Sequence, residues 1–152
     1  MTVRWGYPFL SSLASFGATA MLATIADAFY FSPSPLHSLL HSDDPYIWGP
    51  FAAFPPSMGS LLYLLTKELR IVWLKPKFIV AVFYGLLITY CFAIEALSRE
   101  TMGHGYLFLI WMALTFPGFL IVARYRLNGW LLALGIACGI LYGVGYLNVD
   151  LV

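Results

Sequence analysis

Two histidines four residues apart, His37 and His41, are the residues of this chain whose spacing could hold a metal ion. On a helical turn, residues at i and i+4 share one face, and two imidazoles there can bind the same zinc or copper ion. Asp44 follows shortly after them, and His104 is the third histidine of the chain. These four residues form a candidate zinc or copper site. The alternative is a hydrated loop whose histidines lie at the level of lipid headgroups.

Two carboxylates, Asp27 and Glu95, lie near the ends of long apolar stretches. An ionised carboxylate at the centre of a bilayer costs about 2.5–3.5 kcal/mol, and less near the ends of a span. Arg99 can pair with Glu95 along one helix face, whereas Asp27 needs a partner from another helix or remains protonated. We expect all three to line a site for a solute or ion, the alternative being acids that lie at the membrane interface without a function.

The composition decides which class of protein must position these residues. Hydrophobic residues make up 61% of the 152-residue chain and charged residues only 10%. A soluble domain has about 45–50% apolar and about 25% charged residues. Because so few charges cannot cover a surface that faces water, a soluble globular enzyme is excluded, and the high hydrophobicity also excludes a disordered chain. The length predicts one domain, and the remaining class is an integral membrane protein.

Five apolar stretches approach the roughly 20 residues that a helix needs to cross a bilayer. They cover Pro8–Phe31, Trp48–Leu65, Phe78–Leu97, Tyr106–Val122 and Trp130–Leu147. The connections between them are short. The sequence therefore predicts an all-α, polytopic bundle of five transmembrane helices without a soluble domain.

Charge predicts the orientation of these five helices, because loops that carry Lys and Arg stay in the cytoplasm. With five spans, every basic residue except Arg99 falls on one side of the membrane, and every acid except Glu68 falls on or near the other. This separation places the N-terminus in the cytoplasm and the C-terminus outside. The expected location is the cell membrane, most simply a bacterial inner membrane.

Small residues indicate which helices pack closely. In lipid, helices associate through close contact rather than through exclusion from water, and glycine lets two backbones approach. The last apolar stretch carries Gly135, Gly139 and Gly143 on one face, and the first is rich in Ala, Ser and Gly. We expect these two helices to pack tightly, either against each other or against a second copy of the chain.

Prolines interrupt the second apolar stretch. Pro55 and Pro56 remove two backbone donors, and each ring clashes with the carbonyl four residues earlier. The pattern predicts that regular helix begins only near Pro56, after a non-helical or re-entrant segment. Since irregular backbone at membrane depth must be covered by protein or water, Pro55 and Pro56 are candidate residues of a binding cavity. The alternative is a short helix that starts late.

The function predicted from these patterns is the binding of a small solute or ion, or of a partner membrane protein, at the outer face. Phosphate-binding loops, HExxH and GxSxG motifs are absent from the sequence, which favours a non-enzymatic transport component or accessory subunit. The bilayer and a second copy or another membrane protein are the expected partners. The net charge of +1 gives no indication of nucleic-acid binding. The alternative function is a membrane-embedded metal-dependent enzyme or redox protein that uses the histidines and nearby acids.

Overall fold

The computed structural model describes residues 6–41, 44–69, 75–97 and 104–149 of the chain, and these residues form helices joined by short connections, with no strand among them. The protein is all-α. The six helices are α1 (Gly6–Phe31), α2 (Pro35–His41), α3 (Asp44–Leu69), α4 (Pro76–Leu97), α5 (His104–Arg124) and α6 (Gly129–Val149). Each of the five apolar stretches of the sequence thus forms a long helix.

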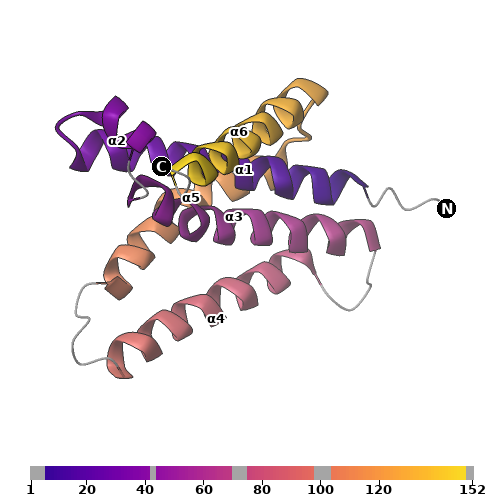
Figure 1. The fold of residues 1–152 in the computed structure, drawn as a ribbon. Helices are drawn as coiled ribbons and strands as arrows, with labels where there is room; N and C mark the ends of the chain where they lie inside the picture. The colour runs from indigo at the N-terminus through magenta and orange to yellow at the C-terminus, as the bar shows by residue number, and fades with distance from the viewer. Residues whose placement is uncertain (1–5, 42–43, 70–74, 98–103, 150–152) are drawn as a thin grey trace.

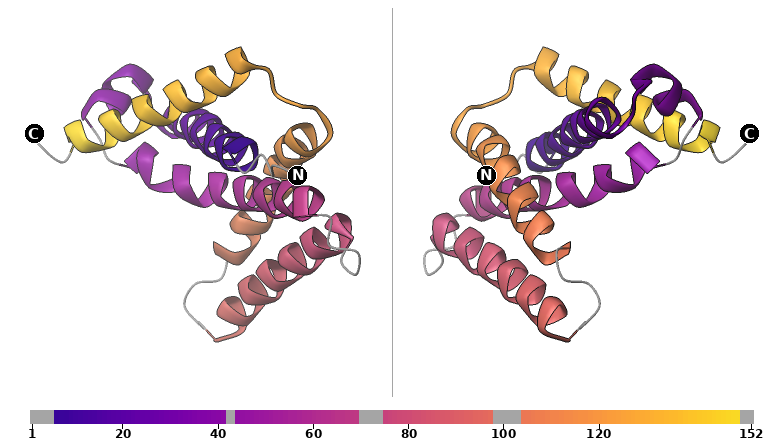
Figure 2. Two further views of the ribbon diagram at one scale, coloured as in Figure 1. Left: turned by 90° about the vertical axis from the view of Figure 1, so that its right-hand side faces the viewer. Right: turned by 90° about the vertical axis from the view of Figure 1, so that its left-hand side faces the viewer.

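The long helix α3 lies in the middle of the bundle (Figure 1). It packs against α1 on one side and against α4 and α5 on the other, and α1 lies between α3 and α6. Figure 2 shows α6 and α4 on opposite sides of the molecule, with α1 and α3 between them. Among the described residues, α4 contacts only α3 and α5. Helix α4 diverges from α3 toward the C-terminal end of α4 (Figure 1).

The basic side chains of three helix ends gather at one end of this bundle. Lys67 at the end of α3, Lys77 at the start of α4 and Arg124 at the end of α5 line one cavity. The Tyr7 hydroxyl at the start of α1 accepts a hydrogen bond of 2.9 Å from the Leu127 amide, just before α6. The long helices therefore run alternately up and down, and we call this end of the molecule the basic end.

Helices α1 and α6 contact each other through glycine, as the small residues predicted. A Cβ atom added to Gly17 would lie 2.6 Å from the backbone nitrogen of Gly139, and one added to Gly135 would lie 2.7 Å from the Cβ of Ala14. Since real Cβ atoms essentially never approach other heavy atoms so closely, side chains at these positions would force the two helices apart. The contact is made within one chain. Gly143 has nothing within 4 Å of its added Cβ, so the third glycine of the series does not take part.

The proline-rich helix α3 corrects the expectation of a broken span. It is continuous from Asp44 to Leu69, with Pro50, Pro55 and Pro56 inside it, so the prediction of a helix that begins near Pro56 was wrong. Proline is tolerated in membrane helices where neighbouring groups bind the carbonyls that it frees. Pro50 removes the donor for the Tyr46 carbonyl, and the Tyr142 hydroxyl of α6 donates to that carbonyl at 2.7 Å.

Short polar side chains between α1 and α3 bond to backbone carbonyls. The Ser12 hydroxyl of α1 donates to the Ser57 carbonyl of α3 at 2.9 Å, and the Ser60 hydroxyl donates to the same carbonyl. Thr24 is completely buried and donates to the Ala20 carbonyl one turn earlier. Such side chains keep the interface narrow and leave their own polar groups satisfied, which a bilayer interior requires.

The short helix α2 places His37 and His41 on one helical turn. It is tied to the bundle opposite the basic end, where the Tyr46 hydroxyl of α3 donates to the Leu39 carbonyl at 2.7 Å. The Tyr46 ring lies against Gly145 of α6, where a Cβ would approach the phenol to 2.5 Å. This end of the molecule is therefore held by α2, α3 and α6 together.

Among the described residues, three helices are long and apolar enough to cross a membrane: Gly6–Phe31, Pro76–Ala93 and Gly129–Asn148. The surface agrees with that role, because large apolar side chains are exposed along α1, α4 and α6, among them Leu22, Leu86 and Leu134. A water-soluble monomer rarely exposes so much contiguous apolar surface. The chain is an all-α bundle with the character of a multi-pass membrane protein.

Candidate functional site

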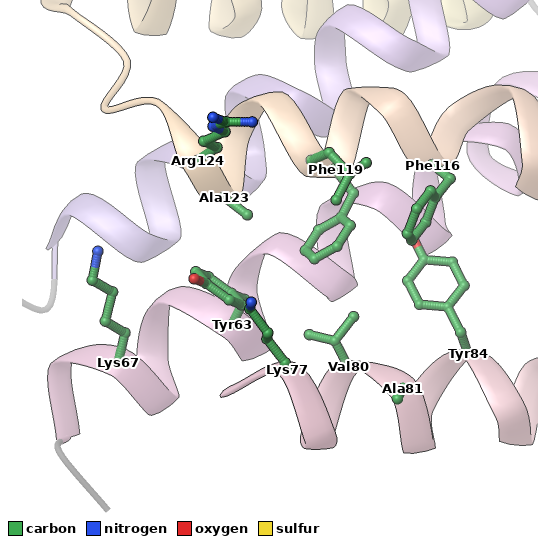
Figure 3. Close-up of a pocket in the computed structure, with 11 residues that line it drawn as sticks. Tyr63, Lys67, Lys77, Val80, Ala81, Tyr84, Phe116, Phe119, Ala123 and Arg124 are labelled. Carbon is green, nitrogen blue, oxygen red and sulfur yellow. The ribbon is translucent and has the colours of Figure 1, made fainter. Parts of the chain in front are cut away.

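A cavity of about 620 Å³ lies at the basic end between α3, α4 and α5. Ligand sites in proteins commonly have volumes of about 300–1,000 Å³. Three exposed cationic side chains, one from each helix, stand around it: Lys67, Lys77 and Arg124. The remainder of the lining is aromatic or aliphatic, and consists of Tyr63, Val80, Ala81, Tyr84, Phe116, Phe119, Leu120 and Ala123. Figure 3 shows the cations toward one side of the cavity and the rings of Tyr84 and Phe116 toward the other.

The aromatic wall is a cluster of mutually packed rings. Tyr84 of α4 makes edge-to-face contact with Phe116 of α5 at a centroid distance of 5.5 Å, and Phe119 lies 6.0 Å away. Tyr63 of α3 makes a similar edge contact with Phe119 at 6.2 Å. These distances lie in the favourable range for aromatic pairs. The rings thus join α3, α4 and α5 through side chains rather than through backbone contact.

Tyr84 owes its position to Gly59 of α3. A Cβ at Gly59 would lie 3.0 Å from the edge of the Tyr84 ring and 3.3 Å from its hydroxyl, so the missing side chain makes room for the phenol. The hydroxyl is buried and has no hydrogen-bond partner within the described part of the chain. Such a group costs about 1–3 kcal/mol. The interface therefore stabilises the bundle through the ring and not through the hydroxyl.

A second, more polar cavity of about 270 Å³ adjoins the first, and Lys67, Ala123 and Arg124 line both. It lies between the start of α1 and the ends of α3 and α5. Its own lining adds mainly polar or charged groups to the shared residues: Tyr7, Leu64, Glu68, Val122, Tyr125 and Arg126.

The two cavities carry a net positive charge. Lys67, Lys77, Arg124 and Arg126 face a single acid, Glu68, among the described lining residues. The Arg126 guanidinium lies 5.2 Å from the Tyr7 ring centre, within the range of a cation–π contact. The ring restricts the direction of this cation without neutralising it. The arrangement can hold an anion by charge and hydrogen bonding, and it offers apolar surface beside that anion.

The residues predicted to bind a solute do not lie in these cavities. Asp27 is buried in α1, with 9% of its surface exposed. Pro55 and Pro56 are buried within α3, and neither lines the cavities above. The side chain of Glu95 and the whole of Arg99 lie outside the described residues.

The predicted metal ligands are described only in part. His37 and His41 share one face of α2, where their rings stack at 4.4 Å, and Nδ1 of His41 lies 3.3 Å from the His37 carbonyl oxygen. The side chains of Asp44 and His104 lie outside the described residues. Within the described part of the chain, no group of three or more His, Cys, Asp or Glu side chains could hold a metal ion. The zinc or copper site stays a prediction.

Sequence reasoning missed the cavity, although a signal for it exists. It used Lys67, Lys77 and Arg124 for orientation alone. On each helix, however, the cation shares a face with an aromatic residue: Tyr63 lies four residues before Lys67, Tyr84 seven after Lys77, and Phe116 eight before Arg124. A cation and a ring on one face of three helices at the same end of the bundle indicate a shared amphipathic site.

No protein-family model, curated protein or solved structure matches this chain. Its function must therefore be argued from its own residues.

Proposed function

We propose that this chain crosses the cell membrane five times, with its N-terminus and basic end in the cytoplasm and its C-terminus outside, as in a bacterial inner-membrane protein. Three helices have the required length and hydropathy. The alternating direction of the five long helices supports two further crossings by α3 and α5. The gathering of Lys67, Lys77, Arg124 and Arg126 at one end supports the orientation, because basic loops stay in the cytoplasm.

Helix α3 can cross the membrane although its sequence is less apolar. It is covered by α1, α4 and α5, and so lipid does not have to solvate its whole circumference. Its polar side chains also bond within the helix: the Ser57 hydroxyl donates to the Phe54 carbonyl and the Thr66 hydroxyl to the Leu62 carbonyl. A span that is shielded by neighbours tolerates such residues.

Within this frame, the protein is a non-enzymatic binding protein for a small anionic ligand, acting as a transport component or an accessory subunit. The observation that carries this proposal is the aromatic cavity of about 620 Å³ with Lys67, Lys77 and Arg124 around it. Three cations from three helices concentrate positive potential at one point. A bundle of five spans is small for a complete transporter, so a second copy or another membrane protein completes the assembly.

The binding of a solute, ion or partner at the outer face, through Asp27, Glu95 and Arg99, stays a prediction. The charged cavities of the described residues lie at the basic end, which is why we place the ligand there.

The test is binding of decyl phosphate and of decyl maltoside, its uncharged counterpart, to the purified protein by native mass spectrometry. We expect decyl phosphate to bind in preference to decyl maltoside. The triple variant Lys67→Gln, Lys77→Gln, Arg124→Gln should remove that preference. Lys75→Gln is the matched control, because Lys75 is exposed at the same end and lines neither charged cavity. Equal binding of the two detergents by the unaltered protein would refute an anion site.

A further inference from the structure

The two cavities of the basic end adjoin each other, and we call them the two compartments of one candidate site. Lys67, Ala123 and Arg124 belong to the lining of both. On one side of this shared wall lies the smaller compartment, with Tyr7, Glu68 and Arg126. On the other side lies the larger compartment, with the rings of Tyr84, Phe116 and Phe119. A ligand that fills both must be charged at one end and apolar along the other.

The positive charge where the two compartments meet indicates which chemical group of the ligand binds there. Lys67 and Arg124 stand where the compartments meet, and Arg126 adds a third cation on the polar side. Arginine matches the oxygens of a phosphate with several donors in one plane, and lysine adds a point charge. Glu68 on the polar side would repel a second negative charge but can accept hydrogen bonds from hydroxyl groups. A monoanionic phosphate that carries a hydroxylated substituent fits this set of groups.

The apolar compartment opens toward the surface that faces lipid. Phe116 and Leu120 line it and keep 39% and 46% of their surface exposed. Ala81 on α4 is also exposed, and α4 is held only by α3 and α5 among the described residues. A hydrocarbon chain can therefore reach the rings from the side, without leaving the bilayer.

A water-soluble anion fits less well. It would use the cations but would leave the aromatic compartment to water or to a lipid chain that is not part of the ligand. Burying apolar surface contributes about 25 cal/mol per Å², and only a ligand with a chain gains this contribution. The combination of cations with an aromatic chamber open to lipid favours a ligand that the membrane itself supplies.

We propose that the site binds an anionic phospholipid of the leaflet at the basic end, with its phosphate between Lys67 and Arg124 and one acyl chain against Tyr84, Phe116 and Phe119. This inference rests on the proposed anion site and names its ligand. It assigns the polar compartment to the headgroup and the aromatic compartment to the chain.

The experiment measures lipid binding to the purified full chain by native mass spectrometry. The probes are dioleoyl phosphatidylglycerol, dioleoyl phosphatidylcholine and the chain-free headgroup analogue glycerol 3-phosphate. We expect phosphatidylglycerol to bind about threefold to tenfold more tightly than phosphatidylcholine, the factor given by one or two partly exposed ion contacts. Glycerol 3-phosphate should not bind measurably at the same concentration.

Two pairs of variants test the contribution of each compartment to lipid binding separately. Lys67→Gln with Arg124→Gln should abolish the preference for phosphatidylglycerol, and Lys75→Gln should keep it. Ala81→Trp places a large side chain in the aromatic compartment and should weaken the binding of both lipids. Val82→Trp is its control, because Val82 is exposed on the same helix and does not line the cavity. Circular dichroism and size-exclusion profiles check that each variant is folded.

The outcomes distinguish this inference from the anion site on which it rests. Glycerol 3-phosphate binding as tightly as phosphatidylglycerol would leave the anion site standing and overturn the lipid assignment. Equal affinity for the two phospholipids, or an equal loss in Ala81→Trp and Val82→Trp, would also overturn it. If phosphatidylglycerol is not preferred over zwitterionic phosphatidylcholine, and decyl phosphate is not preferred over decyl maltoside, both proposals fail.

Discussion

The two sides of α3 are built in different ways. On the side of α1 and α6, backbones meet at Gly17 and Gly139, and short hydroxyls such as Ser12 bond across the interface. On the side of α4 and α5, rings such as Tyr84 and Phe119 hold the helices apart, and a cavity remains between them. We call the first the closed side because backbones touch there, although apolar cavities of about 430 and 350 Å³ border its helices. We call the second the open side because rings, and not backbones, surround its cavity.

This difference shows how a helical bundle in lipid can combine stability with binding. Lipid tails are as apolar as the side chains, so tight association needs close backbone contact, which small residues provide. Where large side chains separate helices and leave space between them, that space is available to a ligand. We therefore expect the closed side to respond strongly to added atoms and the open side to tolerate them.

Adding one carbon atom to the closed side should have a large effect. For Gly17→Ala we expect a loss of about 2–3 kcal/mol of stability, because the new Cβ would collide with the backbone of α6, and overpacking costs about 1–3 kcal/mol. For Gly139→Ala we expect about 1 kcal/mol, since its Cβ would lie 3.1 Å from the Cα of Gly17. Thermal unfolding in detergent measures both.

Gly143→Ala on α6, the helix of Gly139, is the matched control, because nothing lies within 4 Å of the Cβ that it adds. Its stability should stay the same or rise slightly, since alanine is the better helix former. An equal loss for Gly17→Ala and Gly143→Ala would show that α1 and α6 do not meet through glycine.

The same substitution of tyrosine by phenylalanine should act in opposite directions on the two sides. Tyr142→Phe removes the donor for the carbonyl that Pro50 frees, and we expect a loss of about 1 kcal/mol, in the range of hydrogen bonds between membrane helices. Tyr146→Phe is its control, because Tyr146 is 41% exposed on the same helix. Unfolding midpoints that fall equally in both variants would contradict the role of Tyr142.

Tyr84→Phe, on the open side, should leave stability unchanged or raise it by about 1 kcal/mol, because the hydroxyl that it removes is buried without a partner in the described chain. Tyr84→Ala should instead lower stability by about 3 kcal/mol, since the ring is lost and the cavity grows. If Tyr84→Phe destabilises as much as Tyr142→Phe, the hydroxyl has a partner that this account lacks.

The smallest effect is expected for Asp27→Asn in α1. Asparagine has nearly the same shape and can form hydrogen bonds in place of the carboxyl group, so we expect less than about 1 kcal/mol of change in stability. Binding of phosphatidylglycerol should also be unchanged, because Asp27 does not line the basic cavities. A large loss of either property would show that the charge of Asp27 is required.

Local patterns in the sequence predicted the helices and the glycine contact. Hydropathy located α1, α4, α5 and α6 to within a few residues, because long apolar stretches have few other solutions in a membrane. The spacing of Gly135 and Gly139 predicted close packing of α6, either with α1 or with a second copy of the chain. Each of these features depends on residues that are neighbours along the chain or on one helix face.

The continuity of α3 and the location of the cavity depend on residues far apart in sequence. The effect of proline on its own helix predicts the loss of the backbone N–H donor at Pro50. It does not predict that the Tyr142 hydroxyl of another helix takes the place of that donor. The candidate site was therefore placed near Pro55 and Pro56, where the helix was expected to break. The cavity at the basic end is lined by α3, α4 and α5 together, and Gly59 of α3 makes room there for the Tyr84 ring of α4, which no single helix reveals.

The orientation of the chain is the claim on which the ligand assignment depends, since it decides which leaflet supplies the lipid. Protease-sensitive epitope tags placed before Met1 and after Val152 test it in spheroplasts and in inside-out vesicles. We expect protease to remove the C-terminal tag only in spheroplasts and the N-terminal tag only in inside-out vesicles. Removal of both tags in the same preparation would contradict five crossings.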